Sequence, residues 1–263
     1  MFRCDVWGVV RGPDLWGPDP PDRFREPKPL QMGRCRRLVV VTPHLDEDVC
    51  AAGGLLATVA ERCVPVDVLA LTEGDGATEG RGDAAAELGH RRAHRCVAYE
   101  RLGVHTVQRH ELLLASGTVR ESEPLVAAAL DEIVGNAGEP DGLWVLAPWQ
   151  HDGHPDHDVA GRAAAAVCDT HRLRLFQFLV AAWRGPQRAE VPWELARSVP
   201  LSPLLGVRKN YAVPAVVHRD GPPGARELLL ATAQPRGTHG RARAVRALTA
   251  HRHCRCGRPP SSR

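Results

Sequence analysis

A short run of β-branched residues, followed at once by acidic and histidine side chains, constrains this chain more than any other feature. The run Leu38–Thr42 is typical of a buried parallel strand. After Pro43, the next five residues bring one imidazole and three carboxylates, in the order His44, Leu45, Asp46, Glu47 and Asp48. Because open α/β sheets bind their ligands at the carboxyl ends of the strands, this cluster lies where such folds carry their chemistry.

A second cluster of the same kind follows another apolar run. Residues Leu143–Pro148 predict a buried strand, and an Ala-rich helix is expected from about Asp158 to Cys168. Between them the sequence runs His151, Asp152, Gly153, His154, Pro155, Asp156, His157. Imidazole and carboxylate are ordinary zinc ligands, and a catalytic zinc keeps one position open for water. Two such loops, each behind a parallel strand, predict one metal site built from both.

The alternation of apolar runs and helical patterns predicts a Rossmann-like α/β fold. We expect a doubly wound, mostly parallel sheet with helices on both faces, in a single domain. The pattern places helices at about 48–62, 84–102 and 123–134, and further strands at 66–71 and 105–107. In the C-terminal third it predicts a strand at 173–180, a loop at 183–203, a strand at 209–217 and a short helix at 225–233. The Pro- and Gly-rich residues 1–36 predict an extended arm, residues 37–235 the folded domain, and residues 236–263 a basic, flexible tail.

Charge and composition argue against several classes of protein. A formal net charge of +3 over 263 residues gives no reason to expect nucleic-acid binding. No apolar run reaches the ~20 residues of a membrane helix, and early charged residues leave no apolar core for a secretory signal. The eight scattered cysteines contain no CxxC pair, which favours reduced thiols and a cytoplasmic location. A homo-oligomer is compatible with this composition.

The two clusters carry a resemblance to a known family. Residues Pro43–Asp48 resemble the Pro-His-Pro-Asp-Asp-Glu motif of the LmbE-like, or PIG-L, zinc-dependent N-deacetylases, and 154–157 repeat that family's His-Pro-Asp-His motif without change. The resemblance covers roughly residues 37–171 and implies an LmbE-like deacetylase domain over 37–235. Carried over position by position, it implies that Zn²⁺ is bound by His44, Glu47 and His157. It also implies three catalytic residues: Asp46 as general base, His154 as the group that stabilises or protonates the reacting amide, and Asp156, which orients His154 and holds it charged.

Three positions of the first motif depart from the family pattern. Leu45 replaces the second proline, Glu47 replaces the zinc-binding aspartate, and Asp48 replaces the glutamate. The acidic pair is thus inverted, and Asp48 is an alternative ligand to Glu47.

The resemblance implies hydrolysis of an N-acetyl group on an N-acetylglucosamine-type amino sugar. A glycoside, a thiol-sugar and an antibiotic precursor are the candidate carriers of that sugar, so the partner is a small amino-sugar or glycoconjugate substrate. Asp75, Arg92 and Asp152 are the candidate substrate contacts. The alternatives are an amidase that acts on a thiol conjugate at the same site, and a non-catalytic relative that binds zinc or carbohydrate.

Overall fold

An eight-stranded sheet forms the centre of the protein. The computed structural model describes residues 27–44, 46–72, 84–115, 117–138, 140–182, 190–216 and 227–231. Its strands are β1 (Lys28–Pro29), β2 (Arg37–Thr42), β3 (Val66–Thr72), β4 (Val107–Leu114), β5 (Leu143–Pro148), β6 (Arg174–Phe178), β7 (Ala196–Val199) and β8 (Glu227–Ala231). They lie in the order β1-β7-β8-β6-β5-β2-β3-β4, and all neighbours are parallel except that β8 runs antiparallel to β6 and β7. The prediction of a mostly parallel sheet is confirmed.

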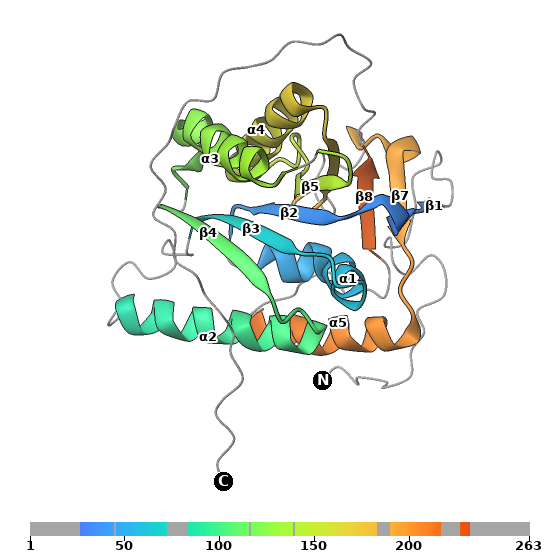
Figure 1. Cartoon of the computed structure of the whole chain (residues 1–263). Helices are drawn as coiled ribbons and strands as arrows, with labels where there is room; N and C mark the ends of the chain where they lie inside the picture. Colours follow the sequence, from blue (N-terminus) through green and yellow to red (C-terminus); the bar gives the residue numbers. More distant parts are fainter. Residues whose placement is uncertain are drawn as a thin grey trace.

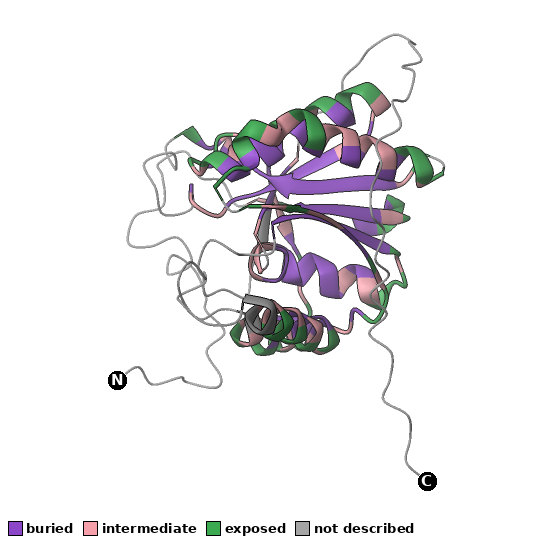
Figure 2. Ribbon diagram, turned by 90° about the vertical axis from the view of Figure 1, so that its left-hand side faces the viewer, coloured by how far each residue is buried: buried purple, intermediate pink, exposed green. Residues whose placement is uncertain are grey.

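Helices cover both faces of this sheet (Figure 1). The helices are α1 (Glu47–Glu61), α2 (Ala84–Leu102), α3 (Glu123–Asn136), α4 (Pro155–His171) and α5 (Pro203–Val216), with short 3₁₀ turns η2 (Met32–Arg34), η4 (Val119–Ser122) and η6 (Trp193–Leu195). Helices α3 and α4 lie on one face, and α1, α2 and α5 lie on the other. Figure 2 shows the strands buried between helices whose outward faces are exposed. None of the helices in the described part of the chain is long and apolar enough to cross a membrane.

Alternation along β2 divides the core into two layers. Leu38 and Val40 belong to the cluster shared with α1 and α2, whereas Val39 and Val41 belong to the cluster shared with α3 and α4. Successive side chains of a strand point to opposite faces, so a continuous apolar run is needed where both faces are covered. This requirement explains why the sequence of β2 carries no polar alternation.

The C-terminal third differs from its prediction. Residues 209–217 were expected as a strand, but 209–216 belong to helix α5; residues 225–233, expected as a helix, contain strand β8. Helix α5 packs against α1 and α2, and β8 pairs with β6 on one side and β7 on the other. Both assignments therefore depend on distant partners, which override local propensity.

Smaller differences concern boundaries. The short strand expected at 105–107 begins at Val107 and continues to Leu114, and the loop expected at 183–203 contains η6 and β7. Within the expected N-terminal arm, β1 pairs with β7, and Leu30, Met32 and Cys35 are buried. Residues 1–26 and the expected tail lie outside the described residues.

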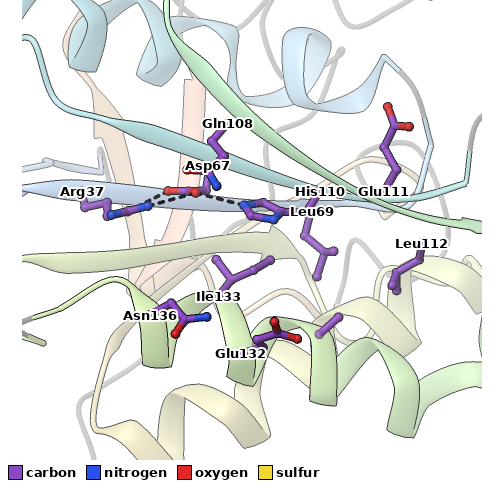
Figure 3. Close-up of a pocket in the computed structure, with 11 residues that line it drawn as sticks. Arg37, Asp67, Leu69, Gln108, His110, Glu111, Leu112, Glu132, Ile133 and Asn136 are labelled. Atoms are coloured by element: carbon purple, nitrogen blue, oxygen red, sulfur yellow. Dashed lines mark hydrogen bonds and ion pairs between the residues drawn. The ribbon is translucent and has the colours of Figure 1, made fainter. Parts of the chain in front are cut away.

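A buried carboxylate near the start of β3 links three strands (Figure 3). Asp67 accepts two hydrogen bonds from Arg37, with the shorter N–O distance 2.7 Å, and lies 3.1 Å from Nε2 of His110. Burial alone would raise the pKa of Asp67, but the hydrogen bonds from His110 and Arg37 outweigh it and lower the pKa below its usual value. The ionised carboxylate therefore stabilises the contact between β2, β3 and β4.

This contact predicts a pH-dependent effect of Asp67→Asn. A carboxyl whose pKa is lowered by folding stabilises the protein above its unfolded pKa of about 3.9, and this stability is lost as the pH falls through the folded value. The variant should be less stable by about 3 kcal/mol at pH 6, and the difference should shrink below about pH 4. Urea unfolding of both proteins from pH 6 to pH 3 measures it. A constant difference over this range would show that ionisation of Asp67 is not its cause.

Candidate metal centre

The two histidine-bearing loops lie side by side because β2 and β5 are adjacent parallel strands. From β2 the chain moves to β3 and β4 in one direction, and it then returns to place β5 on the other side of β2. Ligands of open α/β sheets bind outside the strand ends where this reversal occurs. The β2–α1 loop and the β5–α4 loop meet at that point.

The β2–α1 loop is held by the ends of two strands. Thr42 Oγ1 donates to the carbonyl of His44 at 2.6 Å. Thr72, the last residue of β3, donates to the carbonyl of Pro43 from its backbone N–H at 3.1 Å and from its hydroxyl at 2.8 Å. These bonds fix the backbone on both sides of Pro43 and so place His44 at the edge of the sheet.

The start of α4 is fixed by its own sequence. Pro155 occupies the first turn, where a missing N–H costs no helical bond, and His154 caps the helix by accepting the N–H of Asp156 on Nδ1 at 3.2 Å. A Cβ on Gly161 would lie 2.7 Å from backbone atoms of Pro148 and Gln150. Glycine therefore lets α4 approach the end of β5 closely.

Three imidazoles converge at the junction of the loops. His44, His154 and His157 each offer a ligand atom, and these atoms all lie within 4.8 Å of one another. The ring centroids of His44 and His157 are 5.5 Å apart, and those of His154 and His157 are 4.4 Å apart. The predicted convergence of the two loops is confirmed.

The two acidic residues that begin α1 face different surroundings. Glu47 Oε1 lies 2.6 Å from His157 Nε2, and Glu47 Oε2 accepts the N–H of His44 at 3.3 Å. Asp48 is fully buried on the other side, where it accepts hydrogen bonds from the Tyr99 hydroxyl and from the N–H of Val49. Burial raises the pKa of Asp48, and the bond from Tyr99 opposes that change. The carboxylate that faces the histidines is therefore that of Glu47.

Asp152 does not occupy the position expected of a substrate contact. It is fully buried, and it accepts the backbone N–H groups of Val180, Ala181 and Ala182 at 2.7–3.1 Å. Its Oδ2 also lies 2.6 Å from His157 Nδ1. Burial would raise the pKa of Asp152, but these bonds lower it. The expected contact with substrate is thus corrected: Asp152 orients His157, because its oxygens are already engaged.

His157 lies between two carboxylates. Burial lowers its pKa, but hydrogen bonds with Asp152 and Glu47 outweigh burial and raise the pKa of His157 to about 10. When His157 is protonated, its Nε2 donates a hydrogen bond to the Glu47 carboxylate. Both of these atoms could instead coordinate a metal ion.

The remaining candidate catalytic residues have distinct environments. Asp46 precedes α1 without a capping hydrogen bond from its side chain, and its pKa is raised, first by burial and then by the charge of Glu47. Burial and the neighbouring histidines lower the pKa of His154, so this ring is not held charged as the sequence predicted. The Asp156 carboxylate accepts the N–H of Gly117 and lies 3.7 Å from His44 Nε2, and only its backbone N–H contacts the His154 ring.

Two candidate substrate contacts remain predictions. Arg92 forms an ion pair with Glu111 of β4 at 2.9 Å. Asp75 lies outside the described residues.

Three contributors to the site had no clear signal in the sequence. Two of them are backbone N–H groups, those of residues 180–182 and of Gly117, which no pattern of side chains reveals. The third is Tyr99, which lies 51 positions after its partner Asp48, too far for a local motif to connect them. Only the fold brings these groups to the loops.

The donor set fits a divalent metal ion. Within the described residues, His44 Nε2 and Asp156 Oδ1 are buried without a hydrogen-bond partner. Buried polar atoms are normally paired, so these two atoms indicate a missing polar or charged partner between the loops. Imidazole nitrogens with a carboxylate oxygen suit zinc, and iron and cobalt also accept this set.

Comparison with known proteins agrees with this arrangement. A family model described as PIG-L: GlcNAc-PI de-N-acetylase matches residues 39–168, which contain both loops. No sequence among curated proteins matches the chain.

Solved structures share the fold at low sequence identity. The zinc-inhibited form of teicoplanin deacetylase Orf2 is 20% identical with a TM-score of 0.54, covering 68% of this chain and 83% of that chain. A deacetylase–teicoplanin complex is 16% identical with a TM-score of 0.57, covering 74% and 97%. GalB, the 4-carboxy-2-hydroxymuconate hydratase of Pseudomonas putida KT2440, is 17% identical with a TM-score of 0.55, covering 78% and 100%. Since a hydratase shares the scaffold with deacetylases, the fold alone does not fix the reaction. The family match does cover both histidine-bearing loops, and residues 39–168 of this chain match the PIG-L, or LmbE-like, family.

Proposed function

We propose that the protein is a metal-dependent N-deacetylase that hydrolyses the N-acetyl group of an N-acetylglucosamine-type amino sugar within a glycoside. The observation that carries this proposal is the meeting of His44, Glu47 and His157 beside Asp46, a half-buried carboxyl with a raised pKa. The family description, GlcNAc-PI de-N-acetylase, supports the acetylated sugar as the substrate class.

His44, Glu47 and His157 are the residues that would hold the ion. His154 Nδ1 already accepts a backbone hydrogen bond, so in the neutral ring Nε2 carries the proton and donates. That tautomer favours His154 as a hydrogen-bond donor over His154 as a ligand. Glu47 then completes two imidazoles and one carboxylate, a set found in catalytic zinc sites.

The chemistry divides between the ion and the side chains. When bound, a divalent ion supplies Lewis-acid polarisation of a carbonyl and makes water a better nucleophile. Asp46 takes the proton of the attacking water, because its raised pKa makes it a better base than an exposed aspartate. His154 donates from Nε2 to the carbonyl oxygen as negative charge develops there. Asp46 then returns its proton to the departing amine, which completes the hydrolysis to acetate and free amine.

Two other functions use the same geometry. A thiol-conjugate amidase would differ only in the acyl group and the substrate pocket. A non-catalytic relative was suggested by the exchange of aspartate for glutamate at position 47. The Glu47 carboxylate nevertheless lies 2.6 Å from His157 Nε2, so the longer side chain still faces the site, which favours an active centre.

Acetate release tests the proposal. The purified protein is stripped with a chelator, reloaded with zinc, iron or cobalt, and assayed for free amine on a panel of N-acetylated amino sugars and their glycosides. Thiol conjugates and an enol acid serve as alternative substrates for the amidase and hydratase reactions. Metal-dependent release of acetate from a sugar supports the proposal. The proposal would be refuted if the protein turned over only a substrate of another class, or if it bound metal but turned over none of these substrates.

Asp152→Asn should lower the affinity of the site for its metal ion, although it removes no ligand. Asp152 fixes the ring and tautomer of His157, and loss of such an outer contact typically lowers metal affinity 10- to 100-fold. Competition with a chelator measures the affinity. Asp169→Asn is the matched control: it lies at the exposed far end of α4, the helix that carries His157, and should bind the metal normally. Equal affinity of both variants would show that Asp152 does not support the ligand.

A further inference from the structure

The support for His157 extends to a turn that follows β6. Strands β5 and β6 are adjacent and parallel, so the chain leaves both at the same edge of the sheet. At that edge the N–H of Trp149 donates to the carbonyl of Phe178 at 2.8 Å, and the N–H of Asp152 donates to the carbonyl of Trp149 at 3.1 Å. These bonds hold the β5–α4 loop against residues 179–182, which we call the β6 turn.

The β6 turn surrounds a buried negative charge with three consecutive backbone N–H groups. Those of Val180, Ala181 and Ala182 all donate to Asp152, which is fully buried. A carboxylate removed from water needs such donors, because its burial would otherwise be strongly unfavourable. Asp152 in turn lies 2.6 Å from His157 Nδ1. The orientation of the His157 ring therefore depends on where these three N–H groups lie.

Apolar burial, rather than regular secondary structure, fixes the β6 turn. Its two end residues, Leu179 and Ala182, belong to a buried cluster that is separate from the two main cores. The other members of this cluster are Trp149, Val191, Trp193, Ala196 and Leu230. Backbone donors in a turn have no ladder of strand bonds to hold them, so the packing of the side chains at its two ends sets their position.

Trp193 contributes one of the two indole rings of this cluster. It begins η6, a single 3₁₀ turn of three residues that contacts β8. A turn this short has little stability of its own, so the burial of its one large side chain holds it in place. Trp193 is only 7% exposed, which makes it a packing group rather than a surface for substrate.

We propose that Trp193 is a positioning residue of the metal centre. Its ring completes the cluster that fixes the β6 turn, the turn fixes Asp152 through three N–H groups, and Asp152 fixes the ring of His157. A residue of the C-terminal third thus sets the geometry of a ligand on α4. This inference rests on the proposed function in one respect, which is that His157 binds the metal ion.

Competition with a chelator on the zinc-loaded full chain measures the effect. Trp193→Leu keeps an apolar side chain but removes the bulk of the ring, and it should lower the affinity for zinc about tenfold. Trp193→Phe restores an aromatic ring and should recover most of the affinity. Ile133→Ala is the matched control, because it truncates a buried side chain of α3 in a different core, and it should bind zinc as the parent does.

A double-mutant cycle with Asp152→Asn separates positioning from a general loss of stability. If Trp193 acts through Asp152, then Trp193→Leu should change the zinc affinity less than about twofold in the Asp152→Asn protein, where the support of His157 is already weakened. The proposal would be overturned by equal effects in both backgrounds, by an unchanged affinity in Trp193→Leu, or by an equal loss of affinity in Ile133→Ala.

Amide hydrogen exchange of the metal-free chain tests the link between Trp193 and the β6 turn. The N–H groups of residues 180–182 should exchange faster in Trp193→Leu than in the parent and in Ile133→Ala, because the turn opens more often when its packing is lost. Unchanged exchange at these three positions would overturn the proposal. The measurement needs neither metal nor substrate, so a failure of this inference is distinguishable from a failure of the proposed function.

Discussion

Asp46→Asn is expected to keep its metal ion and to hydrolyse the N-acetyl substrate about 10² to 10⁴ times more slowly. Asparagine has nearly the same shape as aspartate but accepts no proton at neutral pH. Asp46 adjoins the proposed ligand Glu47, and its pKa is raised by burial and by the charge of Glu47, as suits a general base. The rate of acetate release and the metal content per chain are measured on the same preparation.

The paired measurements separate two explanations of a slow variant. A loss of activity together with loss of metal would mean that Asp46 acts as a ligand. Glu61→Gln, at the far end of α1, is the control for effects of charge on that helix and should behave as the parent. A normal rate in Asp46→Asn would show that another group takes the proton.

Glu47→Ala should lose the metal, whereas Asp48→Ala should lose stability and keep it. Glu47 faces His157 at 2.6 Å, and Asp48 is fully buried against Tyr99. Removal of the Asp48 carboxylate leaves the buried Tyr99 hydroxyl without its acceptor, which costs about 1–3 kcal/mol of unfolding free energy. Metal analysis and urea unfolding of both variants distinguish the two effects.

His157→Ala is the reference for a lost ligand in this experiment. It should bind metal at least 100-fold more weakly, and Glu47→Ala should resemble it, because a three-ligand catalytic site depends on each ligand. The opposite result, in which Asp48→Ala binds no metal and Glu47→Ala binds it normally, would assign the carboxylate ligand to Asp48 instead.

The N-terminal part of the fold was predictable because its signals are local. β2 and β5 are continuous apolar runs, and their side chains fill both faces of the sheet, so the sequence itself records their burial. Helix α2 was predicted with the bounds that it has, Ala84–Leu102. Parallel strands place their carboxyl ends at one edge, so the meeting of His44 with His157 also followed from the sequence.

Other parts of the site depended on positions that no local pattern records. The sequence left Glu47 and Asp48 as alternative metal ligands. The structure distinguishes them, because the start of α1 directs the Glu47 carboxylate toward His157 and the Asp48 carboxylate toward Tyr99. Asp152 was expected to contact substrate, but it accepts three backbone N–H groups from 180–182. Backbone donors are the same in every sequence, so only their placement distinguishes them.

By itself, then, the sequence determined the alternation of strands and helices between residues 37 and 178 and the residue types that follow β2 and β5, because apolar periodicity and turn chemistry act over a few neighbouring residues. Tertiary structure alone decided that 203–216 form a helix and 227–231 a strand, and which side chains share a hydrogen bond across the two loops. These outcomes depend on contacts between residues far apart in the chain. Helix α5 is stabilised by apolar burial against α1 and α2, and β8 by the hydrogen bonds that β6 and β7 supply.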